Sequence, residues 1–153
     1  MKVLVNLANR VKNLSVDDLI HELSEYPDFT DLIIELNTKN QLYDKGVNSK
    51  NELLGEYSPF TKQLKQEKGQ ITDHITLNDT GAFYNSFSVF LRGRDLIISA
   101  DVVKDTSDLI TDWGKEILGL SEESLVLLRE KAKQILIPYV KQILLNNRWN
   151  ANL

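Results

Sequence analysis

Three carboxylates close together in the sequence have the clearest potential for chemistry. Asp101, Asp105 and Asp108 surround Lys104 in a polar stretch. Acidic side chains at such spacing can ligate calcium or serve a hydrolase as acids and bases. The segment from Asp101 to Asp112, however, lacks the central Gly and the final Glu of an EF-hand loop. Because 26% of the residues are charged, we interpret these carboxylates as solvated loop residues.

Other groups that could carry out catalysis are sparse. The chain contains no Cys, which excludes disulfides, thiolate metal sites and a Cys nucleophile. Its two histidines, His21 and His74, lie far apart in the sequence, so each is interpreted as a polar residue rather than a metal ligand. No Gly-rich phosphate loop, HExxH motif or GxSxG motif is present. We therefore predict no catalytic residue, no cofactor and no metal, and a protein that is not an enzyme.

Length and charge limit the kind of protein further. The 153 residues are 42% hydrophobic, enough for one domain over residues 1–153 with its own core. A net charge of -4 argues against a nucleic-acid partner, because such binding uses clustered cations. The apolar N-terminus is interrupted by Asn6, Asn9 and Arg10 before a signal-peptide core forms, and no apolar run is long enough to span a membrane. We expect a soluble protein made in the cytoplasm, without a membrane partner.

A β-hairpin is predicted between Phe87 and Ala100. Apolar residues alternate with other residues on both sides of a short turn, which is the pattern of paired strands with one buried face. The alternating residues are Phe87, Val89 and Leu91 before the turn, and Leu96, Ile98 and Ala100 after it. Gly93, next to Arg94, can adopt the positive φ that a tight turn requires.

Helices are predicted before and after this hairpin. Apolar spacing and capping residues predict helices over 3–14, from Ser15 to 24, over 31–43 (capped by Asp28 or Thr30), over 59–68 and from Ser121 onwards. The predicted fold is therefore α+β: a central antiparallel β-hairpin or small sheet packed against N-terminal helices and a long C-terminal helix.

Three intervening segments carry weaker predictions. Residues 44–57 are predicted to form a flexible loop or weak hairpin, and residues 71–77 a strand. Lys62, Lys65 and Lys68 are expected to form a basic stripe on their helix. In the loop, the inward-facing residues are expected to be Val47, Leu53 and Leu54.

Two short motifs flank the hairpin. The first is Leu77-x-x-Thr80-Gly81-x-Phe83-x-x-Ser86-Phe87; the second is Trp113-Gly114 followed by Ile117-Leu118-Gly119-Leu120-Ser121-x-Glu123. From the residues alone, we expect Asp79 or Thr80 to cap a one-turn helix, the two phenylalanines to reach the core and Ser86 to satisfy a backbone group. By this interpretation the motifs shape the fold and carry no chemistry.

In this order the motifs resemble those of the tail-completion and head–tail connector (neck) proteins of tailed bacteriophages. Many of those proteins carry an L-x-x-T-G-x-L-x-x-S-[IF] segment before a hairpin and an aromatic-Gly element after it; one branch adds an F-L-G-L-S-like segment that caps a C-terminal helix. The matching positions are Leu77, Thr80, Gly81, Phe83, Ser86, Phe87, Gly114, Leu118, Gly119, Leu120 and Ser121. The resemblance covers roughly residues 77–136. It departs at Phe83, where the family often has Leu, and at Leu109-Ile110, where it often has Tyr-Ala.

The resemblance implies a virion structural protein that forms a ring at the neck or tail end. Its partners would be copies of itself and the portal, connector or tail proteins of the same particle, and it would be assembled in the host cytoplasm. Possible contact residues are Gly93 and Arg94 in the hairpin turn, the 44–57 loop, and Trp149 in a C-terminal tail over 146–153; Trp149 could equally fold back onto the core. Two alternatives stay open: a small cytoplasmic binding or regulatory module without catalysis and, more weakly, a hydrolase that uses the scattered carboxylates.

Overall fold

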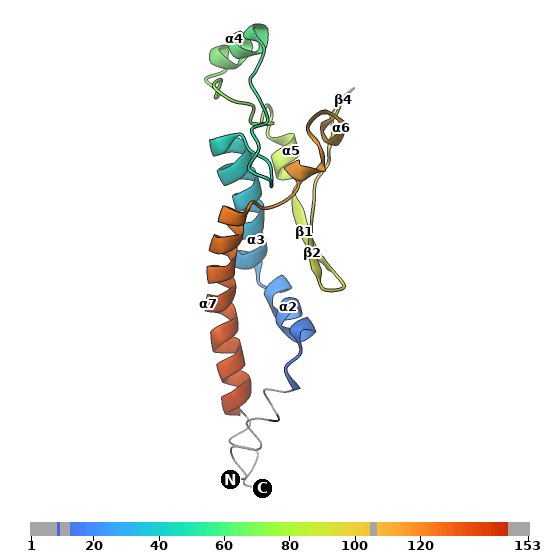
Figure 1. Cartoon of the computed structure of the whole chain (residues 1–153), viewed down its shortest axis with the longest axis vertical. Coiled ribbons are helices and arrows are strands. Elements are labelled where there is room, and N and C mark those ends of the chain that lie inside the picture. Colours follow the sequence, from blue (N-terminus) through green and yellow to red (C-terminus); the bar gives the residue numbers. More distant parts are fainter. Residues whose placement is uncertain (1–8, 10–12, 105–106, 147–153) are drawn as a thin grey trace.

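The computed structural model describes residues 9, 13–104 and 107–146, which form an elongated α+β fold (Figure 1). The expected helix over 3–14 lies mostly outside these residues, and Trp149 lies wholly outside them. In chain order the elements are α2 (Val16–Ser24), α3 (Pro27–Glu35), the π-helix η1 (Leu36–Lys45), α4 (Pro59–Glu67), α5 (Ala82–Asn85), β1 (Ser88–Arg92), β2 (Asp95–Ser99), β3 (Val103–Lys104), β4 (Ser107–Asp108), α6 (Leu109–Trp113), the 3₁₀ helix η2 (Lys115–Ile117) and α7 (Glu122–Asn146). None of the helices in these ranges is both long and apolar enough to cross a membrane.

The predicted hairpin is confirmed, and the apolar residues predicted to share one face lie opposite each other on the two strands. β1 and β2 pair antiparallel, so that Val89 lies opposite Ile98 and Leu91 opposite Leu96. Gly93 occupies the turn with a φ of +65°, a conformation that glycine adopts without steric cost. β3 and β4 form a second, two-residue pairing beyond the hairpin.

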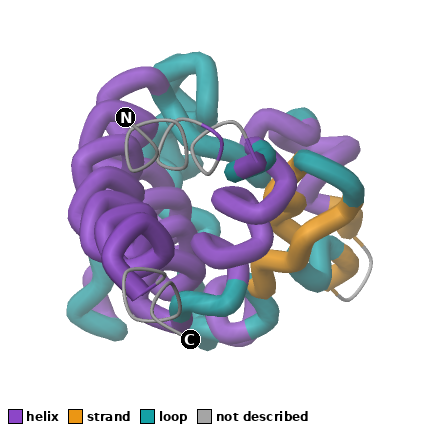
Figure 2. Tube along the Cα trace, turned by 90° about the horizontal axis from the view of Figure 1, so that it is seen from below, coloured by secondary structure: helices purple, strands orange, loops and turns teal. Residues whose placement is uncertain are grey.

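The hairpin packs against helices from both ends of the chain. Leu23, Phe29 and Ile33 from α2 and α3 form a buried cluster with Ile135 of α7. Half-buried side chains of the hairpin cover this cluster: Val89, Leu96 and Ile98. The predicted arrangement of a central hairpin between N-terminal helices and a long C-terminal helix is therefore confirmed. Figure 2 shows the strands on one side of the molecule and most of the helical turns on the other.

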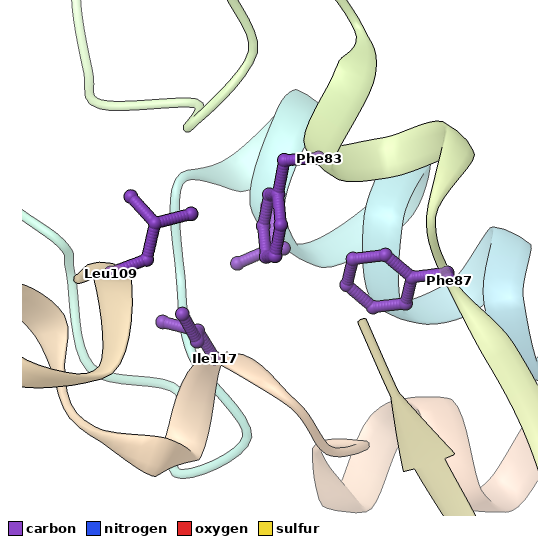
Figure 3. Close-up of a cluster of buried hydrophobic side chains, with 5 residues drawn as sticks. Phe83, Phe87, Leu109 and Ile117 are labelled. Carbon is purple, nitrogen blue, oxygen red and sulfur yellow. The ribbon is translucent and has the colours of Figure 1, made fainter. Parts of the chain in front are cut away.

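A second buried cluster joins the two sequence motifs. It contains Leu42 of η1, Phe83 and Phe87 of the first motif, Leu109 of α6 and Ile117 of the second motif (Figure 3). Because these residues come from four separate stretches of the chain, the cluster connects the π-helix, the entry to the hairpin and the approach to α7.

Most predicted helix starts are confirmed by their caps. Ser15 and Asp18 form a reciprocal capping box at α2, and the Ser58 hydroxyl accepts a hydrogen bond from the Thr61 N–H at the start of α4. Ser121 precedes α7, where its hydroxyl accepts a bond from the Ser124 N–H. The last helix continues past Pro138 to Asn146.

The predicted helix over 31–43 is wrong at its start and in the type of its second half, whereas its end is predicted to within two residues, since the helical run stops at Lys45. Neither Asp28 nor Thr30 caps it: α3 begins at Pro27, after the N-cap Tyr26. A proline is tolerated there because the first helical turn has no partner for its N–H. From Leu36 to Lys45 the backbone widens into a π-helix, a change that the apolar spacing does not encode.

Two other local predictions are also wrong. Residues 71–77 form no strand, since Leu77 adopts a φ of +54°, outside the β region. The 44–57 segment does contain the weak hairpin, as a single bridge between Val47 and Leu53, but Leu53 is 74% exposed. Successive residues of an extended segment point to opposite sides, and here Leu54 is the one that packs on the core.

Candidate functional site

The first motif builds the entry to the hairpin. Gly81 is the N-cap of α5 with a φ of +83°, and the Thr80 hydroxyl accepts a 3.3 Å hydrogen bond from the Ala82 N–H. Phe83 and Phe87 are buried and pack edge to face, with ring centroids 5.0 Å apart (Figure 3). The two phenylalanines fill the core as predicted. The predicted cap is wrong, because the N-cap of α5 is Gly81 and not Asp79 or Thr80.

Ser86 connects this motif to the chain that leaves the hairpin. Its hydroxyl donates a 2.6 Å hydrogen bond to the Phe83 carbonyl and accepts a 2.9 Å bond from the Asp101 N–H. The predicted role of Ser86 in satisfying a backbone group is therefore confirmed by its bond to Phe83. Its bond from Asp101, on the far side of the hairpin, was not predicted.

The second motif is held by two amide side chains of the π-helix. Asn37 donates from Nδ2 to the Ile117 carbonyl and accepts at Oδ1 from the Gly119 N–H, both at 2.9 Å. Gln41 donates from Nε2 to the Gly119 carbonyl at 2.9 Å and accepts at Oε1 from the Ser121 N–H at 2.8 Å. Asn37 and Gln41 are both almost completely buried. We call this pair the amide clamp; it gives the segment 117–121 the hydrogen bonds that a neighbouring strand would otherwise supply.

Sequence reasoning missed the amide clamp. Asn37 and Gln41 are spaced four residues apart on a helix that was predicted from its apolar residues, and no role was assigned to its polar ones. Burial of an amide requires partners for its donor and acceptor groups, and those partners lie about 80 positions away along the chain.

The remaining residues of the second motif also serve the fold. A Cβ at Gly119 would lie 3.0 Å from the Ser49 side chain, so the backbone approaches the 44–57 loop as closely as a glycine permits. Leu118 packs on the cluster around Phe83, and Leu120 on the cluster around Ile135. Gly114 ends α6 with a φ of +82°.

Beside the first motif lies an open groove of about 480 Å³. It runs between α4, α5 and the β3–β4 pair, and it is large enough for one or two bulky side chains. Its apolar wall includes Leu64, Ile75, Leu77, Phe83, Val103 and Trp113. Its charged side chains are Lys65, Lys68, Asp79, Asp101 and Lys104. We call this space the α4 groove.

Lys65 is buried in the wall of the α4 groove. It is only 7% exposed, and its ammonium donates to the Gln70 Oε1 and the Asn78 carbonyl, both at 2.9 Å. The same nitrogen lies 4.9 Å from the centre of the Tyr57 ring, a cation–π geometry. These are neutral partners, so the Lys65 charge adds a positive potential to the groove.

Asp79 organises the two other lysines of the groove. Its carboxylate lies 2.9 Å from the Lys68 ammonium and 3.4 Å from that of Lys104. Hydrogen bonding from Lys68, together with Lys104, lowers the pKa of Asp79 below its ordinary value. Lys62 instead pairs with Glu56 at 3.0 Å. The predicted basic stripe of Lys62, Lys65 and Lys68 is therefore wrong, because the three ammonium groups point to different partners.

Two of the three clustered carboxylates, Asp101 and Asp108, accept hydrogen bonds from nearby backbone N–H groups. Asp108 accepts hydrogen bonds from the Ile110 and Thr111 N–H groups at the start of α6, and Asp101 accepts one from the Val103 N–H. Asp105 lies outside the described residues. Within the ranges that the structure describes, no three His, Asp or Glu side chains are grouped so as to hold a metal ion.

The two histidines lie apart in the fold. His21 is exposed in the last turn of α2. His74 is half-buried, with Nε2 2.7 Å from the Tyr43 carbonyl and Nδ1 2.8 Å from Asp73. It therefore holds the loop around it against the end of η1.

The residues predicted to contact other subunits differ in whether they already bond to other parts of the chain. Gly93 faces open space, whereas Arg94 is paired with Asp17 of α2. The 44–57 loop is tied down, since the Ser49 N–H bonds the Glu116 carbonyl and Lys50 pairs with Glu116 at 2.9 Å.

Large apolar side chains are exposed on several elements. They include Tyr26 between α2 and α3, Phe60 and Leu64 on α4, Phe90 on β1, Val103 on β3, and Val126, Leu127, Ile137 and Leu145 on α7.

Comparison of the chain with protein-family models, with curated proteins and with solved structures finds no match.

Proposed function

We propose that this chain is a non-enzymatic structural subunit of a tailed-bacteriophage virion. It assembles with copies of itself into a ring at the joint between head and tail, as a neck or tail-completion protein, and contacts the portal, connector or tail proteins of the same particle. It reaches the virion after assembly in the host cytoplasm.

This proposal rests on the structural roles of the motif residues. Those that resemble the phage family, from Leu77 to Ser121, cap helices, fill the core around Phe83 and support the hairpin and α7. A motif that specifies a scaffold suits a protein whose function lies in its surface.

The exposed apolar side chains supply a second argument. Val126, Leu127 and Ile137 on α7 are each about half exposed, and Phe60 on α4 is 71% exposed. We take these exposed side chains on α4 and α7 as candidate contacts with neighbouring copies. A ring arises when one face binds a different face of the next copy and the rotation closes.

The alternative is a small cytoplasmic module that binds another protein without catalysis. The α4 groove favours it, since a concave apolar surface with a few polar groups is a common binding site. Sedimentation velocity and electron microscopy of the full chain separate the two functions. The phage proposal requires a closed homo-oligomer; a monomer at every concentration, alone and with portal and tail proteins, refutes it.

Trp149 provides a mutational arm of this test. Deletion of residues 147–153 should leave the circular dichroism spectrum unchanged and weaken ring formation, because a buried aromatic anchor is worth about 2 kcal/mol or more at an interface. Deletion of residues 151–153 alone keeps Trp149 and is the matched control. Loss of folding would place Trp149 in the core, and normal assembly would assign the contact to other residues.

A further inference from the structure

The turn between α2 and α3 presents an aromatic side chain flanked by carboxylates. Tyr26 is 43% exposed, and Glu25 and Asp28 on either side of it are exposed as well. Pro27 follows in the first helical turn, which limits the motion of the backbone. We call residues 25–28 the acidic elbow.

The surroundings of the acidic elbow are strongly negative. Residues 16–35 contain no Lys or Arg, and their acidic residues are Asp17, Asp18, Glu22, Glu25, Asp28, Asp31 and Glu35. Arg94 pairs with Asp17, Lys131 lies 3.9 Å from Asp28 and Lys39 lies 3.7 Å from Glu35. Seven acidic residues stand against these three cations, so the segment 16–35 keeps a net negative charge together with its ion-pair partners.

The α4 groove has the complementary character. Among its charged side chains, three lysines face two aspartates, which leaves one excess positive charge. Lys68 and Lys104 are 56% and 45% exposed at their side chains, so both ammonium groups can turn toward a new carboxylate. Val103, which is 65% exposed, and Trp113 offer an apolar surface for a ring.

We propose that the acidic elbow of one subunit occupies the α4 groove of the next subunit. Tyr26 lies against Val103 and Trp113, while Glu25 and Asp28 lie beside Lys104 and Lys68. This inference rests on the proposed self-association and names the two faces that carry it.

The contact is intermolecular because the two surfaces are far apart on one chain. The elbow lies where α2 meets α3, near the middle of the long axis, whereas α4, which lines the groove, lies at the top of the view in Figure 1. Since the two faces differ, the contact is heterologous, and each subunit uses one face on each neighbour, as a ring requires.

Crosslinking tests the contact directly, because the chain has no Cys. A Tyr26→Cys/Val103→Cys double variant treated with a short bismaleimide should give a covalent ladder up to the size of the ring. Each single variant alone should stay monomeric on a denaturing gel, and a mixture of the two singles should give a dimer only. A Lys39→Cys/Lys133→Cys pair, whose native side chains are 66% and 63% exposed and lie outside both faces of the contact, is the matched control and should give no ladder.

Charge reversal supplies the second arm. Glu25→Lys and Lys104→Glu should each weaken assembly tenfold or more, because each places like charges together, and the double variant should recover most of the loss. Glu25→Lys should keep the fold, since a cation is favourable at the C-terminal end of α2. Lys133→Glu on α7 is the control for a charge change elsewhere.

Each outcome decides a different point. If the parent forms a ring but the double-Cys variant gives no ladder and the charge swap gives no recovery, the contact is wrong and the ring proposal stands. If Val103→Asp blocks assembly while Tyr26→Ala does not, the groove takes a different partner and the contact is again wrong. If the parent is a monomer under all conditions, both proposals fall.

Discussion

Asn37→Leu is the substitution that most directly tests the amide clamp. Asn37 is fully buried, and its side-chain amide bonds both the Ile117 carbonyl and the Gly119 N–H at 2.9 Å. Leucine has a similar volume but offers neither a donor nor an acceptor. The substitution therefore removes two hydrogen bonds while changing the packing little.

The expected cost comes from the two backbone groups that lose their partner. A buried polar group without a hydrogen bond costs about 1–3 kcal/mol. The Ile117 carbonyl is buried and bears the full cost, whereas Gly119 is half-buried and water can partly replace the amide. We expect the free energy of unfolding to fall by about 2–4 kcal/mol, which for a chain of this length lowers Tm by roughly 4–16 °C.

Urea unfolding followed by circular dichroism measures this change. Asn40→Leu, on the same π-helix at a half-buried position for which the described residues provide no side-chain hydrogen bond, is the control and should change stability by less than about 0.5 kcal/mol. If Asn37→Leu behaves like this control, the segment 117–121 is held by apolar packing alone and the clamp reasoning is refuted.

Two further substitutions test the packing around residues 74–84. Burial raises the pKa of Tyr84, whose hydroxyl donates a hydrogen bond to the Thr76 carbonyl. Above pH 10 the tyrosine of the unfolded chain loses its proton, whereas Tyr84 of the folded protein keeps it. The free energy of unfolding should therefore fall as the pH rises past 10. In Tyr84→Phe the urea midpoint between pH 9 and 11 should decline less steeply, and an unchanged slope would contradict the assignment. Gly46→Ala places a Cβ 2.5 Å from the His74 ring and should destabilise more than Gly93→Ala, which meets only open space and costs about 1 kcal/mol of backbone strain. Equal melting temperatures of the two alanine variants would show that the His74 loop moves aside.

The sequence by itself determined the elements whose signals are local. The two-residue alternation around Gly93 predicts the hairpin because each strand must turn one face to the core. Ser15, Ser58 and Ser121 predict helix starts because a side-chain oxygen satisfies N–H groups within three residues. Phe83 and Ser86 of the first motif were assigned correctly, since Phe83 packs in the core and the Ser86 hydroxyl bonds the Phe83 carbonyl three residues away.

Tertiary structure alone decided the features that depend on partners far along the chain. The π-helix places Asn37 and Gln41 against residues 117–121, and no local pattern shows which polar side chains will be buried with partners. Lys65 is buried in the groove rather than solvated with Lys62 and Lys68, because the Gln70 side chain and the Asn78 carbonyl accept hydrogen bonds from its ammonium group. The α4 groove likewise exists only once separate stretches are folded, since its walls come from residues 57–83 and 101–113 together.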